Sequence, residues 1–189
     1  MKIGLYFGSF NPIHNGHLAI ARFLKQKNLF NQIWMVVSPN NPLKDKTDLA
    51  PEKDRLNMVK LAIQGFPYLH ACGVEFSLPL PSYTINTLNY LEKQYPNDEF
   101  SLILGADNIE NFHKWKDYEE ILQRYTLYVY PRYGEALEKT PAHPHIIYLD
   151  APLLPISATN IRTLLQQRKP VSEYLPALVM RYIEREQIY

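Results

Sequence analysis

Short apolar segments alternate with longer amphipathic segments along almost the whole chain. Six apolar runs have the length of strands, and they cover residues 2–7, 32–38, 69–76, 100–107, 126–132 and 145–150. Strands that alternate with helices favour a parallel sheet with right-handed crossovers and helices on both faces. The sequence therefore predicts an α/β fold with a Rossmann-like parallel sheet, whose ligand binds at the carboxyl ends of the strands.

Between these runs, apolar residues recur at spacings of three and four, as they do on one face of a helix. This spacing predicts helices over residues 17–26, 51–66, 83–94, 117–125, 157–167 and 174–186. The proline-bearing segments 38–45 and 138–145 are typical of surface loops. A chain of 189 residues with 46% hydrophobic residues can bury the core of one domain, so we expect a single domain over residues 1–189.

The charge and the cysteine content of the chain limit which classes of partner and which cellular compartment are expected. The formal net charge is +1 and no local basic patch stands out, which disfavours a nucleic-acid partner. Cys72 is the single cysteine, and MKIGLYF is not a charged and then apolar leader, which together indicate the reducing cytoplasm. No apolar run reaches the ~18 residues that a membrane span needs. A homo-oligomer is compatible with the sequence.

The stretch GSFNPIHNGH follows directly on the first apolar run. A strand, a tight turn and a helix start form a cradle for an anion, because the first N–H groups of a helix lack partners and carry the positive end of the dipole. If the helix begins near Asn15, His14 and His17 lie about one turn apart. Both can then face the anion as hydrogen-bond donors, with partial positive charge when protonated.

Two simpler interpretations of the histidines stay open at this point. They can be incidental residues of a surface helix, or a zinc pair, although no third ligand stands at a suitable spacing. Gly8 and Gly16 favour the anion site, because glycine removes a side chain where the backbone must approach a ligand closely. No side chain is predicted as a metal ligand.

A second candidate anion site lies at ISATNIR, residues 156–162, where another helix is expected to begin. Ser157 or Thr159 can cap this helix and also donate to a phosphate oxygen, and Arg162 offers a fork of donors to β- and γ-phosphates. Alone, these residues are typical of an ordinary cap and a solvated arginine. The chain has no GxxxxGK[ST], and no GxGxxG after its first strand, so neither a Walker-type kinase nor a dinucleotide-binding dehydrogenase is indicated.

Together, GSFNPIHNGH and ISATNIR resemble the hallmark pair of the nucleotidyltransferase superfamily. Four further motifs, SPNNPLK, RLNM, PSYTINTL and LGADNIENFHKW, resemble in the same order the nicotinate-nucleotide adenylyltransferases of bacterial NAD synthesis. The resemblance spans nearly the whole chain. Two segments depart from it: SPNNPLK is shorter than the usual proline-proline-histidine-lysine loop, and PRYG stands where arginine-proline-glycine is common.

The resemblance implies transfer of AMP from ATP to nicotinate mononucleotide, which gives deamido-NAD and pyrophosphate. The acceptor phosphate attacks the α-phosphorus in line without a covalent intermediate, and Mg²⁺ enters with ATP. The implied catalytic residues are His14, His17 and Arg162. The implied ATP-binding residues are Gly8, Ser9, Phe10, His14, Gly16, His17, Ile156, Ser157, Thr159 and Arg162.

The implied mononucleotide-binding residues are Asn11, Lys44, Tyr83, Thr84, Asp107, Trp115 and Arg132. Trp115 can stack on the pyridine ring, and the helix start at Tyr83 and Thr84 can receive its carboxylate. Asp107 ends an apolar run and can bind a ribose hydroxyl, whereas Lys44 can close over phosphates as a mobile cation.

Several interpretations compete with this assignment. Arg132 can also contact ATP, and Arg55, within a predicted helix, is expected to pair with a neighbouring acid outside the site. Phosphopantetheine adenylyltransferase and nicotinamide-mononucleotide adenylyltransferase use the same scaffold, but PSYTINTL and LGADNIENFHKW match the nicotinate family better than the first. A non-catalytic nucleotide-binding module is the third alternative, and the presence of both histidines together with Arg162 argues against it.

Overall fold

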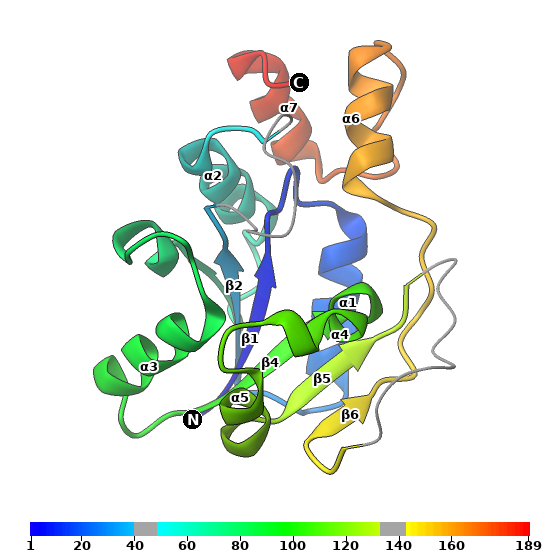
Figure 1. The fold of residues 1–189 in the computed structure, drawn as a ribbon. Coiled ribbons are helices and arrows are strands. Elements are labelled where there is room, and N and C mark those ends of the chain that lie inside the picture. The colour runs from blue at the N-terminus through cyan, green and yellow to red at the C-terminus, as the bar shows by residue number, and fades with distance from the viewer. Residues whose placement is uncertain (40–48, 133–142) are drawn as a thin grey trace.

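The structure is a computed structural model that describes residues 1–39, 49–132 and 143–189. Within these ranges, six parallel strands form one sheet in the order β3-β2-β1-β4-β5-β6 (Figure 1). The strands are β1 (Lys2–Gly8), β2 (Gln32–Val37), β3 (Leu69–Cys72), β4 (Glu99–Gly105), β5 (Leu127–Tyr130) and β6 (Ile146–Tyr148). The predicted loops over 38–45 and 138–145 lie mostly outside the described residues.

The two central strands are apolar along most of their length. Ile3 and Leu5 of β1 and Leu102 and Ile103 of β4 are fully buried, as expected for strands that helices cover on both faces. The strands that follow β1 in the chain, β2 and β3, lie on one side of this pair, whereas β5 and β6, which follow β4, lie on the other side. The pair β1 and β4 is therefore the switch point of the sheet. In open α/β sheets, ligands bind beyond the carboxyl ends of the strands at such a point.

Helices cover both faces of the sheet (Figure 1). One hydrophobic core includes residues of α1 (Asn15–Gln26), α2 (Glu52–Ala62), α6 (Ala158–Gln166) and α7 (Ala177–Glu186). The other includes residues of α3 (Thr84–Gln94), α4 (Ala106–Glu110) and α5 (Tyr118–Arg124). Figure 1 shows α6 and α7 beyond the carboxyl end of β1. This arrangement confirms the predicted α/β fold with a Rossmann-like parallel sheet.

All six predicted strands are present, but two of them continue into helical turns where more strand was expected. The third was predicted to reach Phe76, whereas a short 3₁₀ helix, Val74–Ser77, follows Gly73. The fourth was predicted to reach Asp107, whereas Ala106 and Asp107 begin α4, a helix that was not predicted. The cause is the same in both cases, because a continuous apolar run does not distinguish a buried strand from a buried helical turn.

The six predicted helices are also present. The second was predicted to reach Phe66, whereas α2 ends at Ala62. Gly65 then adopts a left-handed φ of 86°, the conformation in which glycine commonly follows a helix end. Within the described residues, no helix is both long and apolar enough to span a membrane.

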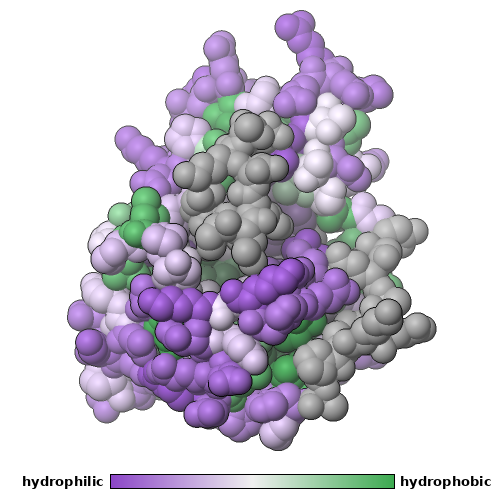
Figure 2. All heavy atoms as spheres, in the orientation of Figure 1, coloured by the Kyte–Doolittle hydropathy of each residue, from purple (hydrophilic) through white to green (hydrophobic). Residues whose placement is uncertain are grey.

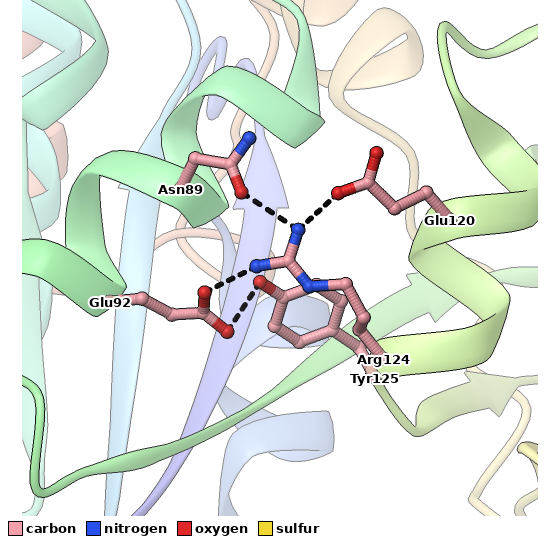
Figure 3. A network of polar contacts seen from close by, with 5 residues as sticks. All are labelled: Asn89, Glu92, Glu120, Arg124 and Tyr125. Atoms are coloured by element: carbon pink, nitrogen blue, oxygen red, sulfur yellow. Dashed lines mark hydrogen bonds and ion pairs between the residues drawn. The ribbon is translucent and has the colours of Figure 1, made fainter.

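A polar network joins α3 and α5 on the outside of the molecule (Figure 3). Arg124 donates to Asn89 Oδ1 at 2.8 Å and forms ion pairs with Glu92 and Glu120. Tyr125 donates its hydroxyl proton to Glu92 Oε1 at 2.6 Å. Figure 2 shows that the face turned toward the viewer is mostly hydrophilic, with hydrophobic residues in small separate groups. Patches of this size are usual on a protein surface.

Candidate active site

A cavity of about 1120 Å³ lies at the carboxyl ends of the strands. It is lined by the ends of β1, β4 and β5 and by the N-terminal ends of α1, α3 and α6. The predicted site residues that line it are Gly8, Ser9, Phe10, Asn11, His14, Gly16, His17, Tyr83, Thr84, Trp115, Arg132, Ile156, Ser157, Thr159 and Arg162. The fold therefore brings together the two motifs from opposite ends of the sequence.

The two histidines lie against each other at the start of α1. His14 is the N-cap residue, and its main-chain N–H donates to Nδ1 of His17 at 3.2 Å. The rings are stacked, with 3.8 Å between their centroids and 26° between their planes. Because Nδ1 of His17 accepts a hydrogen bond, the proton of the neutral ring is on Nε2, which is thus the donor available to a ligand.

Both glycines of the loop make room for a ring of the protein itself. A Cβ on Gly16 would lie 2.9 Å from Nδ1 of His14, and a Cβ on Gly8 would lie 3.0 Å from Cζ of Phe10. Either contact is closer than a real Cβ tolerates without displacement of its neighbour. The structure thus gives these glycines a packing role inside the loop, and since both also line the cavity, the expected close approach of backbone to ligand stays a prediction.

The N-terminus of α6 faces the same cavity. Ser157, rather than Thr159, caps the helix, because its Oγ accepts a hydrogen bond from the N–H of Asn160 at 3.1 Å. One turn further, Nη1 of Arg162 donates to the main-chain oxygen of Asn11 at 3.0 Å. This hydrogen bond joins the C-terminal motif directly to the N-terminal loop.

A row of polar side chains crosses the carboxyl ends of β1, β5 and β4. The hydroxyl of Tyr6 donates to that of Tyr130 at 3.0 Å. The guanidinium of Arg132 lies 6.0 Å from the ring centroid of Tyr130, and its Nη1 lies 3.1 Å from Oδ2 of Asp107. Asp107, in the first turn of α4, does not itself line the cavity, but it contacts it through Arg132, which does. The two tyrosines were not predicted, because they lie within apolar strand patterns.

An aromatic ring, a helix N-terminus and a cation lie together in another part of the cavity. Tyr83 is the N-cap residue of α3 and Thr84 is its first residue, as predicted. The ring of Trp115 packs on that of Phe112, with 5.1 Å between centroids. The ammonium of Lys116 lies 4.9 Å from the ring centroid of Tyr83. Lys116 was not predicted as a site residue, because nothing in FHKWKD distinguishes it from a solvated lysine.

Known proteins match the chain over nearly its whole length. A family model described as cytidylyltransferase-like matches residues 5–164. A protein of Flavobacterium johnsoniae, named probable nicotinate-nucleotide adenylyltransferase, is 47% identical over 191 residues, which cover 100% of this chain and 99% of that protein. A protein of Cytophaga hutchinsonii with the same name is 48% identical over 171 residues, 90% of this chain and 89% of that one. The chain belongs to the nicotinate-nucleotide adenylyltransferase family.

The family membership confirms the resemblance that the motifs indicated. A solved structure of Plasmodium falciparum nicotinic acid mononucleotide adenylyltransferase, complexed with NaAD, has a TM-score of 0.82 with this chain. It is 21% identical, and the match covers 100% of this chain and 97% of that one. At this identity the likeness supports the fold, which is that of the nucleotidyltransferases.

In this member of the nicotinate-nucleotide adenylyltransferase family, both site histidines are neutral near pH 7. Burial, reinforced by the charge of Arg132, lowers the pKa of His14 to about 3. Burial and the neighbouring His14 and Arg132 lower the pKa of His17 well below its ordinary value. Burial thus favours the neutral form of both rings over the protonated form, while the guanidinium groups of Arg132 and Arg162 line the same cavity.

In this member of the adenylyltransferase family, the side chain of Arg55 fixes the loop that follows β1. The sequence did not reveal this role. The Arg55 side chain is 1% exposed. It donates to the main-chain oxygens of Ser9 and Ser38 at 2.7 Å each, and to those of Ala50 and Pro39 at 2.9 Å each. Among the described residues, Arg55 forms no ion pair with a neighbouring acid, and its guanidinium donates to these main-chain carbonyl groups instead.

Lys44 lies outside the described residues, so its role stays a prediction. Asn11 is 3% exposed, and its Oδ1 accepts a hydrogen bond from the N–H of Ala50 at 3.0 Å. Across residues 1–39, 49–132 and 143–189, no three histidine, cysteine, aspartate or glutamate side chains are grouped as metal ligands.

Proposed function

We propose that the protein transfers AMP from ATP to nicotinate mononucleotide, giving deamido-NAD and pyrophosphate, in NAD synthesis. One observation carries this proposal: a single cavity combines donors suited to a triphosphate with a helix N-terminus and an aromatic ring suited to a pyridine carboxylate. His17 and Arg162 belong to the first group, and Trp115 belongs to the second. Relatives that align with nearly the whole chain are named for the same activity. The cytoplasm, where both nucleotides are available, is the proposed compartment.

In the proposed reaction, a phosphate oxygen of the mononucleotide attacks the α-phosphorus of ATP in line. The bond from that phosphorus to the bridging oxygen breaks as the new bond forms, and pyrophosphate leaves with the electron pair. The protein orients the two polyanions and stabilises the charge that develops on the phosphate oxygens. Nε2–H of His17, His14 and the guanidinium of Arg162 fill this role, and no side chain forms a bond to phosphorus.

The remaining donors of the ATP site come from the start of α6. Its first N–H groups and the hydroxyls of Ser157 and Thr159 suit phosphate oxygens, because they are donors at the positive end of a helix dipole. The turn Gly8–Phe10 lines the same cavity as the histidines and completes the proposed ATP site.

We infer that Mg²⁺ is the divalent ion that accompanies ATP. The residues fit an ion that the substrate carries, because the side chains around His17 are donors and the Asp107 carboxylate is paired with Arg132 at 3.1 Å. Mg²⁺ prefers oxygen ligands and keeps several waters, so phosphate oxygens are its proposed ligands. Bound there, it would neutralise part of the negative charge of the triphosphate.

The acceptor carboxylate is proposed to bind at the N-terminus of α3, with Trp115 stacked on the pyridine ring. Main-chain N–H groups near Thr84 can only donate, and the helix dipole favours an anion. The ammonium of Lys116, 4.9 Å from the ring centroid of Tyr83, adds a positive charge nearby. An amide in the same place would present a weaker acceptor or an unmatched NH₂ group, so the acid is the favoured acceptor.

Pyrophosphate release tests the proposal when ATP is combined in turn with nicotinate mononucleotide, nicotinamide mononucleotide and phosphopantetheine. We expect the highest kcat/KM with nicotinate mononucleotide, and no release by a variant that lacks both His14 and His17. Equal kcat/KM for the two pyridine nucleotides would indicate a dual-specificity enzyme. Release with none of the acceptors would indicate a binding module.

A further inference from the structure

The side chain and the main chain of Asn11 join three distant parts of the molecule. Its Oδ1 accepts hydrogen bonds from the N–H of Ala50 at 3.0 Å and from the hydroxyl of Tyr189 at 2.5 Å. Its main-chain oxygen accepts the hydrogen bond from Nη1 of Arg162 at 3.0 Å. The loop that leads to the histidines is therefore held by residues from before α2, from α6 and from the segment after α7.

The segment after α7 is shaped to carry Tyr189 to this point. α7 packs on α2, where the hydroxyl of Tyr182 donates to Oδ1 of Asp54 at 2.8 Å. At Gln187 the backbone adopts a left-handed φ of 54°, and the N–H of Ile188 returns to the oxygen of Ile183 at 3.1 Å. This reversal directs the chain back onto the molecule instead of outward.

The Tyr189 hydroxyl is well suited to orient an amide. Oδ1 of Asn11 has two lone pairs, and the two hydrogen bonds from Ala50 and Tyr189 use both. Burial raises the pKa of Tyr189 above its ordinary value, so the phenol keeps its proton and stays a donor. The side-chain amide of Asn11 is thus fixed with its oxygen toward Tyr189.

We propose that Tyr189 is a positioning residue for adenylyl transfer. Its hydroxyl holds the side-chain amide of Asn11, and this keeps the main-chain oxygen of Asn11 in place to accept the hydrogen bond from Arg162. The inference rests on the proposed function but goes beyond it, since Tyr189 does not line the cavity and belongs to neither motif. Loss of the hydroxyl would leave both substrates bound. The guanidinium of Arg162 would then be less well placed for the charge that develops during transfer.

The test compares Tyr189→Phe with Tyr125→Phe, which removes a matched hydroxyl far from the site. Tyr125 is buried and donates one hydrogen bond, to Glu92 at 2.6 Å (Figure 3). We expect Tyr189→Phe to lower kcat about tenfold with KM for both substrates within twofold, and Tyr125→Phe to leave kcat unchanged. Wild-type kcat in Tyr189→Phe, or equal losses in the two variants, would overturn the proposal.

A double-mutant cycle tests the route through Arg162. In an Arg162→Lys background, Tyr189→Phe is expected to lower kcat by less than twofold, because the engaged guanidinium is already absent. A full tenfold further loss would show that Tyr189 acts independently of Arg162, against the proposal.

Amide hydrogen exchange examines the same contact without any substrate. We expect faster exchange of residues 9–14 in Tyr189→Phe and not in Tyr125→Phe, and unchanged exchange in both would overturn the proposal. Because hydrogen exchange needs no substrate, it tests the role of Tyr189 separately from the proposed function. A wild-type enzyme that is inactive with nicotinate mononucleotide would contradict the proposed function alone.

Discussion

The main chain determines which nitrogen of His17 can serve the substrate. Its Nδ1 accepts the N–H of His14 at 3.2 Å, so Nε2–H is a preorganised donor. Replacement of His17 by alanine removes this donor from the transition state, which typically costs about 3–4 kcal/mol, or a hundred- to a thousandfold in kcat. Steady-state kinetics on a variant with wild-type circular dichroism measure the loss. A kcat within fivefold of wild type would remove His17 from the catalytic group.

Two lysines on either side of Trp115 offer a matched comparison for acceptor choice. The ammonium of Lys116 lies over the ring of Tyr83, whereas that of Lys114 is hydrogen-bonded to Asn111 Oδ1 at 2.8 Å. One partly screened charge contributes about 1 kcal/mol. We therefore expect Lys116→Gln to lower the kcat/KM ratio of nicotinate to nicotinamide mononucleotide about fivefold.

The same ratio is expected to stay within twofold of wild type in Lys114→Gln, and KM for ATP is expected to stay constant in both variants. Equal effects of the two substitutions would mean that general charge, rather than the position of Lys116 beside α3, sets the preference.

At the scale of elements, two arginines show how differently buried and exposed contacts contribute to stability. Arg55 of α2 binds the turn after β1 and the end of β2 through main-chain oxygens. Arg55→Met would leave several of these carbonyl groups buried without a donor, at about 1–3 kcal/mol each. We expect the free energy of unfolding, measured in urea, to fall by about 3 kcal/mol or more.

Arg124→Met is the control for this measurement. Its side chain is 33% exposed between α3 and α5 (Figure 3), and exposed ion pairs contribute about 0–1 kcal/mol each. A loss in Arg124→Met as large as that in Arg55→Met would contradict the assignment of Arg55 as the clamp of the loop.

Elements whose signals are local were predictable from the sequence, whereas contacts between distant elements were not. The start of α1 at Asn15 and the cap at Ser157 are encoded within a few residues. By contrast, Arg55 is an ordinary helical arginine until β1 and β2 surround it with carbonyl groups. Tyr189 likewise has no local signal, because its partner Asn11 lies 178 positions away. Only the folded sheet brings such residues together.

At the scale of the whole molecule, buried histidines make stability depend on pH. The pKa of His14 is lowered from 6.5 to about 3, and that of His17 is also lowered. At a pH between 3 and 6.5, His14 is protonated in the unfolded chain but neutral in the folded one, so the unfolded chain binds more protons. Stability is therefore expected to fall as the pH decreases from 6.5 toward 3, by up to about 1.4 kcal/mol per pH unit for each histidine.

Urea unfolding of wild type and His14→Asn at pH 7, 6 and 5 measures this dependence. The comparison is needed because Glu75, whose pKa is raised by burial, acts in the opposite sense. The wild type should lose more stability than His14→Asn over this range. Parallel losses in the two proteins would show that His14 is not buried in its neutral form.

The hydrogen bonds on Asn11 also set an order of events during synthesis. The histidine loop leaves the ribosome early, but Arg162 and Tyr189, which hold it, follow 151 and 178 positions later. A nascent chain can therefore pair β1 with β4 while its loop still lacks these two contacts, and closing such long-range contacts is a late step of folding. The loop of the proposed nucleotide site is thus expected to reach its final arrangement only after Arg162 and Tyr189 have been synthesised.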